Sequence, residues 1–291
     1  MNDKKKVILD TDIGSDIDDA VCLAYLLSQP KCELMGITTV SGQPVKRAAM
    51  ADAMCRIAGK KTPIHSGAEN PMIVKPLQPE VPQFERLGSR EYSMDFPENS
   101  AVDFLRKTIR ENPHEITLLA IGPFTNIGIL FLIDPEIPSL LKELVLMSGK
   151  FLGDGRAPEW NVKCDPHAAK IMYNADVKIH RSIGIDVTSK VTMERDEVRE
   201  KFKAEILQPV LDFSEAWFSH TKKMTFHDPL AAATVFDDTI CEFSKGNIDV
   251  ETAGTEKDGF TYWEPSNDGR HEAALKVDAD RFTEHYFSVV K

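Results

Sequence analysis

The sequence Val-Ile-Leu-Asp-Thr-Asp-Ile-Gly-Ser-Asp-Ile-Asp-Asp-Ala, residues 7–20, joins a short apolar run to a dense group of acids. Its first three residues are typical of a buried strand, and five carboxylates follow within ten residues. Carboxylates packed together repel one another, so a cation must neutralise them or some must be protonated. Gly14 lets the chain turn sharply enough for both ends of the loop to face one point. A hard cation with oxygen ligands, calcium or magnesium, suits such a group best.

Two simpler explanations of the acids can be tested by counting. Asp18 and Asp19 could cap the helix that follows, because acidic residues favour helix N-termini. Capping needs only one or two acids and leaves those nearer the strand unexplained. An EF-hand loop is excluded, because counting from Asp10 makes Gly14 the fifth residue and puts Val21 where that loop has Glu.

Apolar runs alternate with helical patterns along the rest of the chain. The predicted buried strands are residues 7–9, 33–40, 115–121, 144–147 and 177–185. The predicted helices between them are residues 19–28, 45–58, 102–111 and 166–174, the last with Asp165 as N-cap and Pro166 at its first position. This alternation predicts an α/β fold with one open, mainly parallel sheet and helices on both faces.

The remaining segments complete the expected domain. Residues 77–96 lack a clean period and are predicted as a loop. Residues 241–250 and 273–277 are predicted as antiparallel strands, and residues 282–289 as a closing helix. Since no linker or repeat divides the chain, we expect residues 1–291 to form a single domain.

Charge and composition restrict the partners. A net charge of -11 argues against a nucleic-acid partner, because proteins that bind a phosphate backbone need clustered Lys and Arg. The apolar run near the start is too short for a signal peptide, and no run approaches the length of a membrane span. The five cysteines are scattered, which fits neither a disulfide framework nor a zinc site. We expect a cytoplasmic protein with no membrane partner and a small polar ligand.

Four segments, in order, resemble the inosine-uridine-preferring nucleoside hydrolase family. The resemblance spans roughly residues 6 to 235. Its segments are residues 10–20, the turn Ile-Gly-Pro-Phe-Thr-Asn at 121–126, the triplet Glu-Trp-Asn at 159–161 and His-Asp-Pro-Leu-Ala at 227–231. It implies a Rossmann-like nucleoside hydrolase fold, calcium-dependent hydrolysis of the N-glycosidic bond of ribonucleosides to ribose and free base, and a homodimer or homotetramer.

The resemblance also implies a metal and catalytic set. By position, Asp12 would be both a calcium ligand and the general base that activates the attacking water. Asp19, Asp228 and the backbone carbonyl of Ile121 would be the other protein ligands. His227 would be the acid that protonates the leaving base, and imidazole suits that role because it titrates near neutral pH.

A second set would hold the sugar. The resemblance assigns Asp18 to the ribose 2′-hydroxyl, and Glu159 and Asn161 to the other ribose hydroxyls. Gln43 stands at a further sugar-contact position, where the family usually has Asn. Asp10 would support the ligands from behind.

Two other functions remain open at this point. A magnesium-dependent phosphohydrolase of the haloacid dehalogenase type also has Asp-x-Asp after a buried strand, with Asp10 as nucleophile, but it has Thr or Val where this chain has Gly14. A non-catalytic riboside-binding domain is the third possibility, although it has no need of an acid such as His227 beside the metal. Trp217, Phe218 and His220 could line a base pocket, but aromatic residues at helical spacing more often belong to the core.

Overall fold

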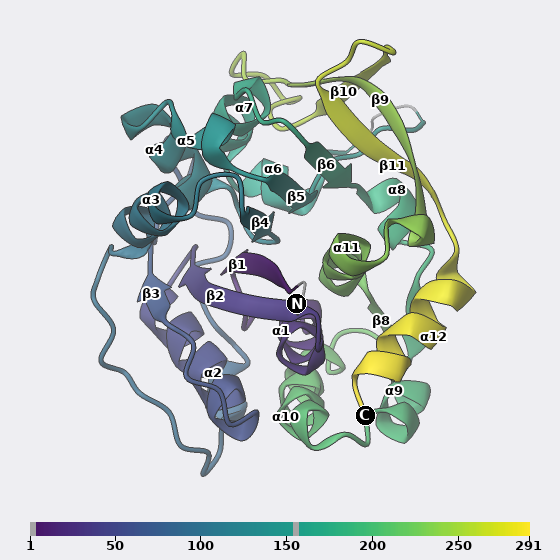
Figure 1. The fold of residues 1–291 in the computed structure, drawn as a ribbon. Coiled ribbons are helices and arrows are strands. Elements are labelled where there is room, and N and C mark those ends of the chain that lie inside the picture. Colours follow the sequence, from purple (N-terminus) through teal and green to yellow (C-terminus); the bar gives the residue numbers. More distant parts are fainter. Residues whose placement is uncertain (1–3, 154–156) are drawn as a thin grey trace.

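The centre of the computed structural model, which describes residues 4–153 and 157–291, is a nine-stranded sheet (Figure 1). Its strands, in spatial order, are β10 (Thr261–Pro265), β9 (Cys241–Val250), β11 (His271–Val277), β6 (His180–Ile183), β5 (Glu143–Met147), β4 (Ile116–Ala120), β1 (Lys5–Thr11), β2 (Cys32–Thr39) and β3 (Ile64–Ser66). Neighbours from β3 to β11 run parallel, and β9 is antiparallel to both β11 and β10. The predicted open, mainly parallel sheet is confirmed.

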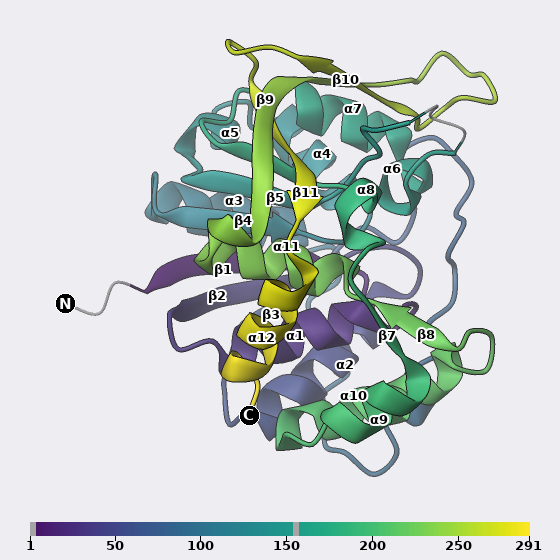
Figure 2. The same cartoon turned by 90° about the vertical axis from the view of Figure 1, so that its right-hand side faces the viewer.

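Helices cover both faces of this sheet (Figures 1 and 2). The α-helices are α1 (Asp18–Ser28), α2 (Pro44–Ile57), α3 (Ala101–Glu111), α4 (Thr125–Ile133), α5 (Ile137–Leu140), α6 (Trp160–Cys164), α7 (Pro166–Asn174), α8 (Ile185–Thr188), α9 (Arg195–Lys201), α10 (Gln208–Trp217), α11 (His227–Phe236) and α12 (Ala279–Val289). Short 3₁₀ turns are η1 (Phe84–Arg86), η2 (Glu205–Leu207) and η3 (Asp238–Ile240). No helix among the described residues combines the length and apolar composition needed to cross a bilayer.

Two hydrophobic cores fill the two faces. Alternate residues of a strand point to opposite faces, and β1 accordingly sends Val7 and Leu9 into one core and Ile8 into the other. The first core also contains side chains of α1, α2, α11 and α12, and the second contains those of α3, α4 and α7. Burial on both faces explains why these strands are continuous apolar runs in the sequence.

The strand order indicates which end of the sheet is suited to bind a ligand. The chain runs outward from β1 through β2 to β3, and then returns to build β4, β5 and β6 on the other side of β1. The carboxyl ends of β1 and β4 therefore flank the point where the strand order reverses. Crevices at such switch points bind ligands in open α/β sheets.

Several boundaries differ from those predicted. The strand predicted at 177–185 shortens to His180–Ile183, because Gly184 follows it and Ile185 begins α8. The closing helix begins earlier than predicted, at Ala279, because Asp278 caps it by accepting a hydrogen bond from the Arg281 N–H at 3.0 Å. The strand predicted at 273–277 pairs antiparallel with β9, as expected, but also parallel with β6.

One part of the chain has no counterpart in the predictions. Strands β7 (Thr192–Glu194) and β8 (Lys223–Thr225) form a separate antiparallel pair, and α9 and α10 lie between them in sequence. Figure 2 shows this group at one end of the molecule, beside α1 and α2. It contributes Trp217, the last residue of α10, to the pocket described below.

Candidate active site

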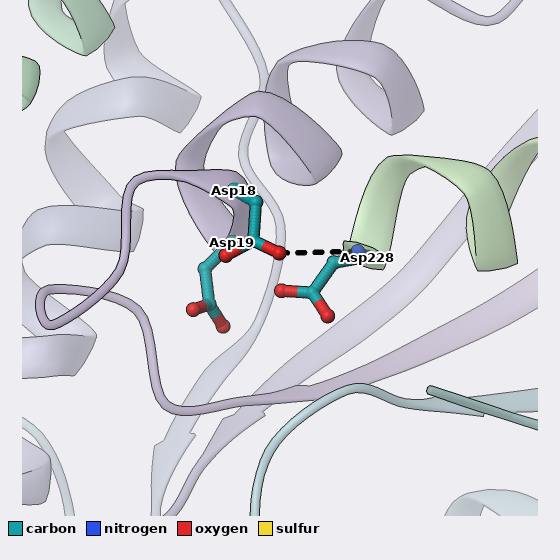
Figure 3. Close-up of side chains that lie close together, drawn as sticks. All are labelled: Asp18, Asp19 and Asp228. Carbon is teal, nitrogen blue, oxygen red and sulfur yellow. Dashed lines mark hydrogen bonds between the residues drawn. The ribbon is translucent and has the colours of Figure 1, made fainter. Parts of the chain in front are cut away.

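Three buried carboxylates from two helix starts meet at the carboxyl end of the sheet (Figure 3). Asp18 and Asp19 open α1, and Asp228 lies in the first turn of α11. One oxygen from each lies within 4.8 Å of the others. The Asp228 N–H donates to the Asp18 carboxylate at 3.2 Å, which ties the two helix starts together. This arrangement suits a hard cation.

The three carboxylates of this cluster repel one another. Burial raises the pKa of Asp18, Asp19 and Asp228 well above the ordinary range, and the neighbouring carboxylates raise it further. The Thr11 hydroxyl donates to Asp19 at 2.5 Å and partly offsets this. A bound cation would remove the repulsion, which is the physical reason to regard the cluster as a metal site.

Asp12 lies in the same pocket but outside that set of three. Its carboxylate follows β1 directly and accepts a hydrogen bond from the Gln78 amide. Burial raises its pKa, and the Arg47 guanidinium and the Gln78 bond lower it. A Cβ at Gly122 would lie 2.7 Å from the other Asp12 oxygen, so the turn after β4 needs a glycine to make room for this carboxylate.

Arg47 is a functional residue that sequence reasoning missed. This fully buried side chain on α2 donates to the backbone carbonyls of Asp12 and Gly42, to the latter at 2.9 Å, and to the Ser15 hydroxyl at 3.1 Å. A further bond reaches the carbonyl of Glu80 at 3.4 Å. It therefore holds the acidic loop in place while supplying positive charge beneath it. The apolar spacing of α2 gave no signal for it.

Asp10 lies behind the pocket, where it holds strand ends together. It is fully buried and accepts hydrogen bonds from the Thr38 hydroxyl at 2.5 Å and the Asn126 amide at 2.8 Å. The same Asn126 accepts from the Ala68 N–H at 2.9 Å. Together these bonds link β1, β2, the segment after β3 and the start of α4. Burial raises the pKa of Asp10 to about 7.

The triplet at 159–161 is brought to the pocket wall. Glu159 caps α6, because its carboxylate accepts from the N–H groups of Asn161 at 2.7 Å and Val162 at 3.2 Å. Burial raises the pKa of Glu159 to about 7, against these bonds. The Asn161 amide donates to the Ile121 carbonyl at 2.8 Å and to the Met147 carbonyl at 3.2 Å, so it spans the ends of two strands.

His227 stands beside the cluster at the start of α11. Its Nδ1 is 2.7 Å from the Thr188 hydroxyl, and burial lowers the pKa of the imidazole to about 4. The ring is therefore neutral at pH 7. If Thr188 donates to Nδ1, the ring proton resides on Nε2.

The carboxylates of the cluster, Asp12, the triplet at 159–161 and His227 line a single pocket of about 640 Å³. The predicted site residues that line it are Asp12, Asp18, Asp19, Ile121, Glu159, Asn161, His227 and Asp228. Asp10 and Gln43 are not among the lining residues, and Gln43 precedes α2 as its N-cap residue in the left-handed conformation at φ 56°. Asp16 lines the pocket, and burial raises its pKa to about 7. Trp217 also lines it, whereas Phe218 belongs to the core.

Comparison with known proteins gives a consistent result. The sequence profile described as "Inosine-uridine preferring nucleoside hydrolase" matches residues 7–284. Uridine nucleosidase 1 of Arabidopsis thaliana is 31% identical over 275 residues, which cover 86% of this chain and 79% of that protein. The inosine-uridine preferring nucleoside hydrolase of Leishmania major is 31% identical over 304 residues, covering 96% of this chain and 95% of that protein.

Solved structures show that the fold is shared. The plant nucleoside hydrolase PpNRh1 superposes with a TM-score of 0.84 at 21% identity, over 98% of both chains. A purine-preferring ribonucleoside hydrolase from Gardnerella vaginalis superposes with a TM-score of 0.83 at 24% identity, again over 98% of both chains.

Proposed function

Because the chain belongs to the inosine-uridine preferring nucleoside hydrolase family and hydrolyses the N-glycosidic bond of ribonucleosides, we propose that the bond is cleaved in the carboxylate-lined pocket at the carboxyl ends of β1 and β4. The observation that carries this assignment is the meeting of Asp18, Asp19 and Asp228 from two distant helices in the pocket that also contains Asp12. Pocket, carboxylates and neutral imidazole together provide a metal site, a base and a proton donor.

Calcium is the cofactor that we propose, with Asp12, Asp19, Asp228 and the Ile121 carbonyl as protein ligands. The oxygen-only donor set fits a hard cation and offers none of the thiolates that softer metals prefer. The Ile121 carbonyl already accepts the Asn161 amide, and its second lone pair remains for a metal. Calcium would lower the pKa of a bound water and coordinate ribose hydroxyls.

Asp12 is the general base in this proposal. It follows β1 at the switch point, where its backbone is held by Arg47 and its carboxylate by Gln78. From there it would take the proton of the attacking water as the bond to the anomeric carbon forms. Direct attack by water predicts inversion at that carbon. The surrounding carboxylates would stabilise the positive charge that develops on the sugar.

Asp18, Glu159 and Asn161 are the proposed ribose contacts. The backbone N–H groups fix the Glu159 carboxylate, and a carboxylate has about four acceptor sites, so one remains for a hydroxyl. Asn161 uses its amide protons on two strand ends, which leaves its carbonyl oxygen for a donor. Both side chains are thus oriented before the sugar arrives, which reduces the entropic cost of binding it.

His227 is the proposed proton donor to the leaving base. Burial keeps the resting imidazole neutral, so Nε2–H of a ring whose Nδ1 is held by Thr188 would donate a hydrogen bond to the base as negative charge develops on it. The ring would recover from solvent any proton that it transfers to the base. Replacing Thr188 would free the ring to adopt the other tautomer, which presents a lone pair to the base instead.

A panel of purine and pyrimidine ribonucleosides tests the assignment. With calcium present we expect release of free base, which chromatography measures. We expect Asp12→Asn to lower kcat about 10²–10⁴-fold while the protein still folds. Asp196→Asn on α9 is the matched control, because that exposed side chain lies outside the pocket. A near-normal rate for Asp12→Asn would refute the assignment of the base. Inductively coupled plasma analysis of the dialysed protein tests the metal.

The pocket geometry does not favour the phosphohydrolase alternative. A nucleophilic Asp10 would have to reach a phosphate ester, but Asp10 is fully buried behind the pocket and its carboxylate is bonded to Thr38 and Asn126. We further propose that the protein is cytoplasmic and forms a homodimer or homotetramer. Light scattering after size exclusion would test the oligomeric state.

A further inference from the structure

The segment between β3 and α3, residues 67–100, forms part of the wall of the pocket; we name it the covering loop. Its described backbone contains only the short turn η1, and Leu77, Gln78 and Pro79 line the pocket. A side chain of this loop therefore faces the carboxylates. Gln78 is the one that bonds to them.

Gln78 bridges two residues that come from different parts of the fold. Its amide nitrogen donates to the Asp12 carboxylate, and its amide oxygen accepts from the Trp160 indole N–H at 2.9 Å. An indole can only donate, so the bond from Trp160 fixes which end of the amide faces which neighbour. The donor end is therefore directed at Asp12.

No other side chain among residues 4–153 and 157–291 donates a hydrogen bond to the Asp12 carboxylate. Arg47 bonds to the Asp12 backbone and so fixes the position of its main chain. Gln78 bonds to the carboxylate itself and so restricts its rotation about the Cβ–Cγ bond. Half-exposed Trp160 lies at the pocket rim, where it connects this contact to α6.

We propose that Gln78 is a positioning residue for Asp12, and that Trp160 orients it. The inference rests on the proposed role of Asp12 as the base. A carboxylate accepts a proton efficiently only when its lone pair points at the water, so loss of the bridge would weaken proton transfer. Because neither bond is made to the substrate, binding of the nucleoside would change little.

Gln78→Met tests the bridge, because it keeps the length of the side chain and removes both polar ends. We expect kcat to fall about 10–100-fold, as for other residues that orient a catalytic group through a hydrogen bond, with KM within about threefold. Trp160→Phe keeps an aromatic ring without the N–H and should lower kcat less. Lys75→Met, at an exposed position of the same loop, is the matched control.

The double variant Gln78→Met/Trp160→Phe separates a relay from two independent effects. If Trp160 acts through Gln78, the double variant is no slower than Gln78→Met alone. If the two losses multiply, or if Gln78→Met has a kcat within threefold of the wild type, the inference is wrong.

An activity-independent measurement distinguishes this inference from the proposed function. The chain has three tryptophans, so its indole N–H signals can be resolved by ¹⁵N-edited NMR, and Trp160→Phe identifies the one of interest. In Gln78→Met that signal should move upfield, while the signal of Trp263, which packs on Phe151, stays in place. An unmoved Trp160 signal overturns the bridge. If the signal moves in Gln78→Met but the wild-type protein releases no base from any nucleoside, the proposed function is wrong, whereas the hydrogen-bonded bridge is confirmed.

Discussion

Arg47 shows how one buried cation organises a cluster of acids. Its guanidinium lies on α2 beneath the loop that follows β1, and burial lowers its pKa while Asp12 and Asp19 raise it. Its hydrogen bonds go to backbone carbonyls and a hydroxyl, so its role is to hold the loop as well as to balance charge. A shorter or neutral side chain could do only part of this.

Arg47→Met should therefore destabilise the protein strongly. Several buried carbonyls would lose their donor at once, and we expect the free energy of unfolding in urea to fall by about 3 kcal/mol or more. Arg56→Met on the same helix removes only a surface pair with Asp52 and should stay within about 0.5 kcal/mol of the wild type. Equal effects of the two changes would contradict this role for Arg47.

Gly14 is the second position where a single residue matters. Its φ is +119°, and a Cβ there would lie 2.3 Å from the Val81 side chain on the covering loop. The sharp turn expected from the sequence is confirmed, and the structure adds the reason for the close approach. Both facts exclude a larger residue at this position.

At the scale of elements, Asp165 joins three segments that the sequence keeps apart. Its carboxylate accepts from the Ala168 N–H at 3.0 Å, as the predicted cap of α7, and from the Thr125 hydroxyl at 2.7 Å. It also accepts from the Met72 N–H at 2.9 Å, which anchors the covering loop. The cap was predictable from Asp followed by Pro, but the other two bonds were not.

Asp165→Ala should cost more than the loss of an ordinary cap. A cap alone is worth about 1 kcal/mol, and the buried Thr125 hydroxyl and the partly buried Met72 N–H would lose their acceptor, so we expect a loss of about 2–4 kcal/mol in urea unfolding. Asp278→Ala, which removes only the cap of α12, is the matched comparison and should cost about 1 kcal/mol. Similar losses in the two variants would show that Asp165 acts as a cap only.

At the scale of the whole molecule, the acidic pocket links stability to pH. Burial raises the pKa of Asp10, Asp16 and Glu159 to about 7 in the folded state, above their ordinary values near 4. At these three carboxyls the folded protein therefore binds more protons than the unfolded chain between about pH 4 and pH 7, so the stability that they contribute is lost as pH rises through that window.

We expect the metal-free protein in EDTA to be less stable at pH 8 than at pH 5.5. The difference should be about 2 kcal/mol or more, or about 5 °C in Tm by calorimetry. A Tm that rises with pH in EDTA would show that these carboxyls are ionised without strain in the folded state.

Calcium should reverse much of this loss. A ligand that binds the folded state alone stabilises it by about 2.7 kcal/mol at a concentration of one hundred times its Kd. Because the ion favours ionised carboxylates, the gain in Tm on adding calcium should be larger at pH 8 than at pH 5.5. An equal gain at both pH values would indicate a calcium site away from the cluster of Asp18, Asp19 and Asp228.

The sequence alone was enough for the architecture and for the chemical type of the site. Short apolar runs and helical apolar patterns are local, so the parallel sheet, its helices and the acidic loop after β1 followed from them. The order of the motifs gave the family. Short elements such as β7, β8 and α8 were missed, because a few residues carry too little periodicity to be recognised.

Only the tertiary structure decided which side chains meet. Asp228 approaches Asp18 from a helix that begins more than 200 residues later. Arg47 reaches Asp12 from α2 and Gln78 reaches it from the covering loop, while Trp160 of α6 bonds to Gln78. Such contacts depend on strand order, loop path and rotamer, none of which leaves a periodic trace in the sequence. The acids within residues 7–20 were therefore predictable as a group that suits a cation. The groups that position these acids became evident only in the folded chain.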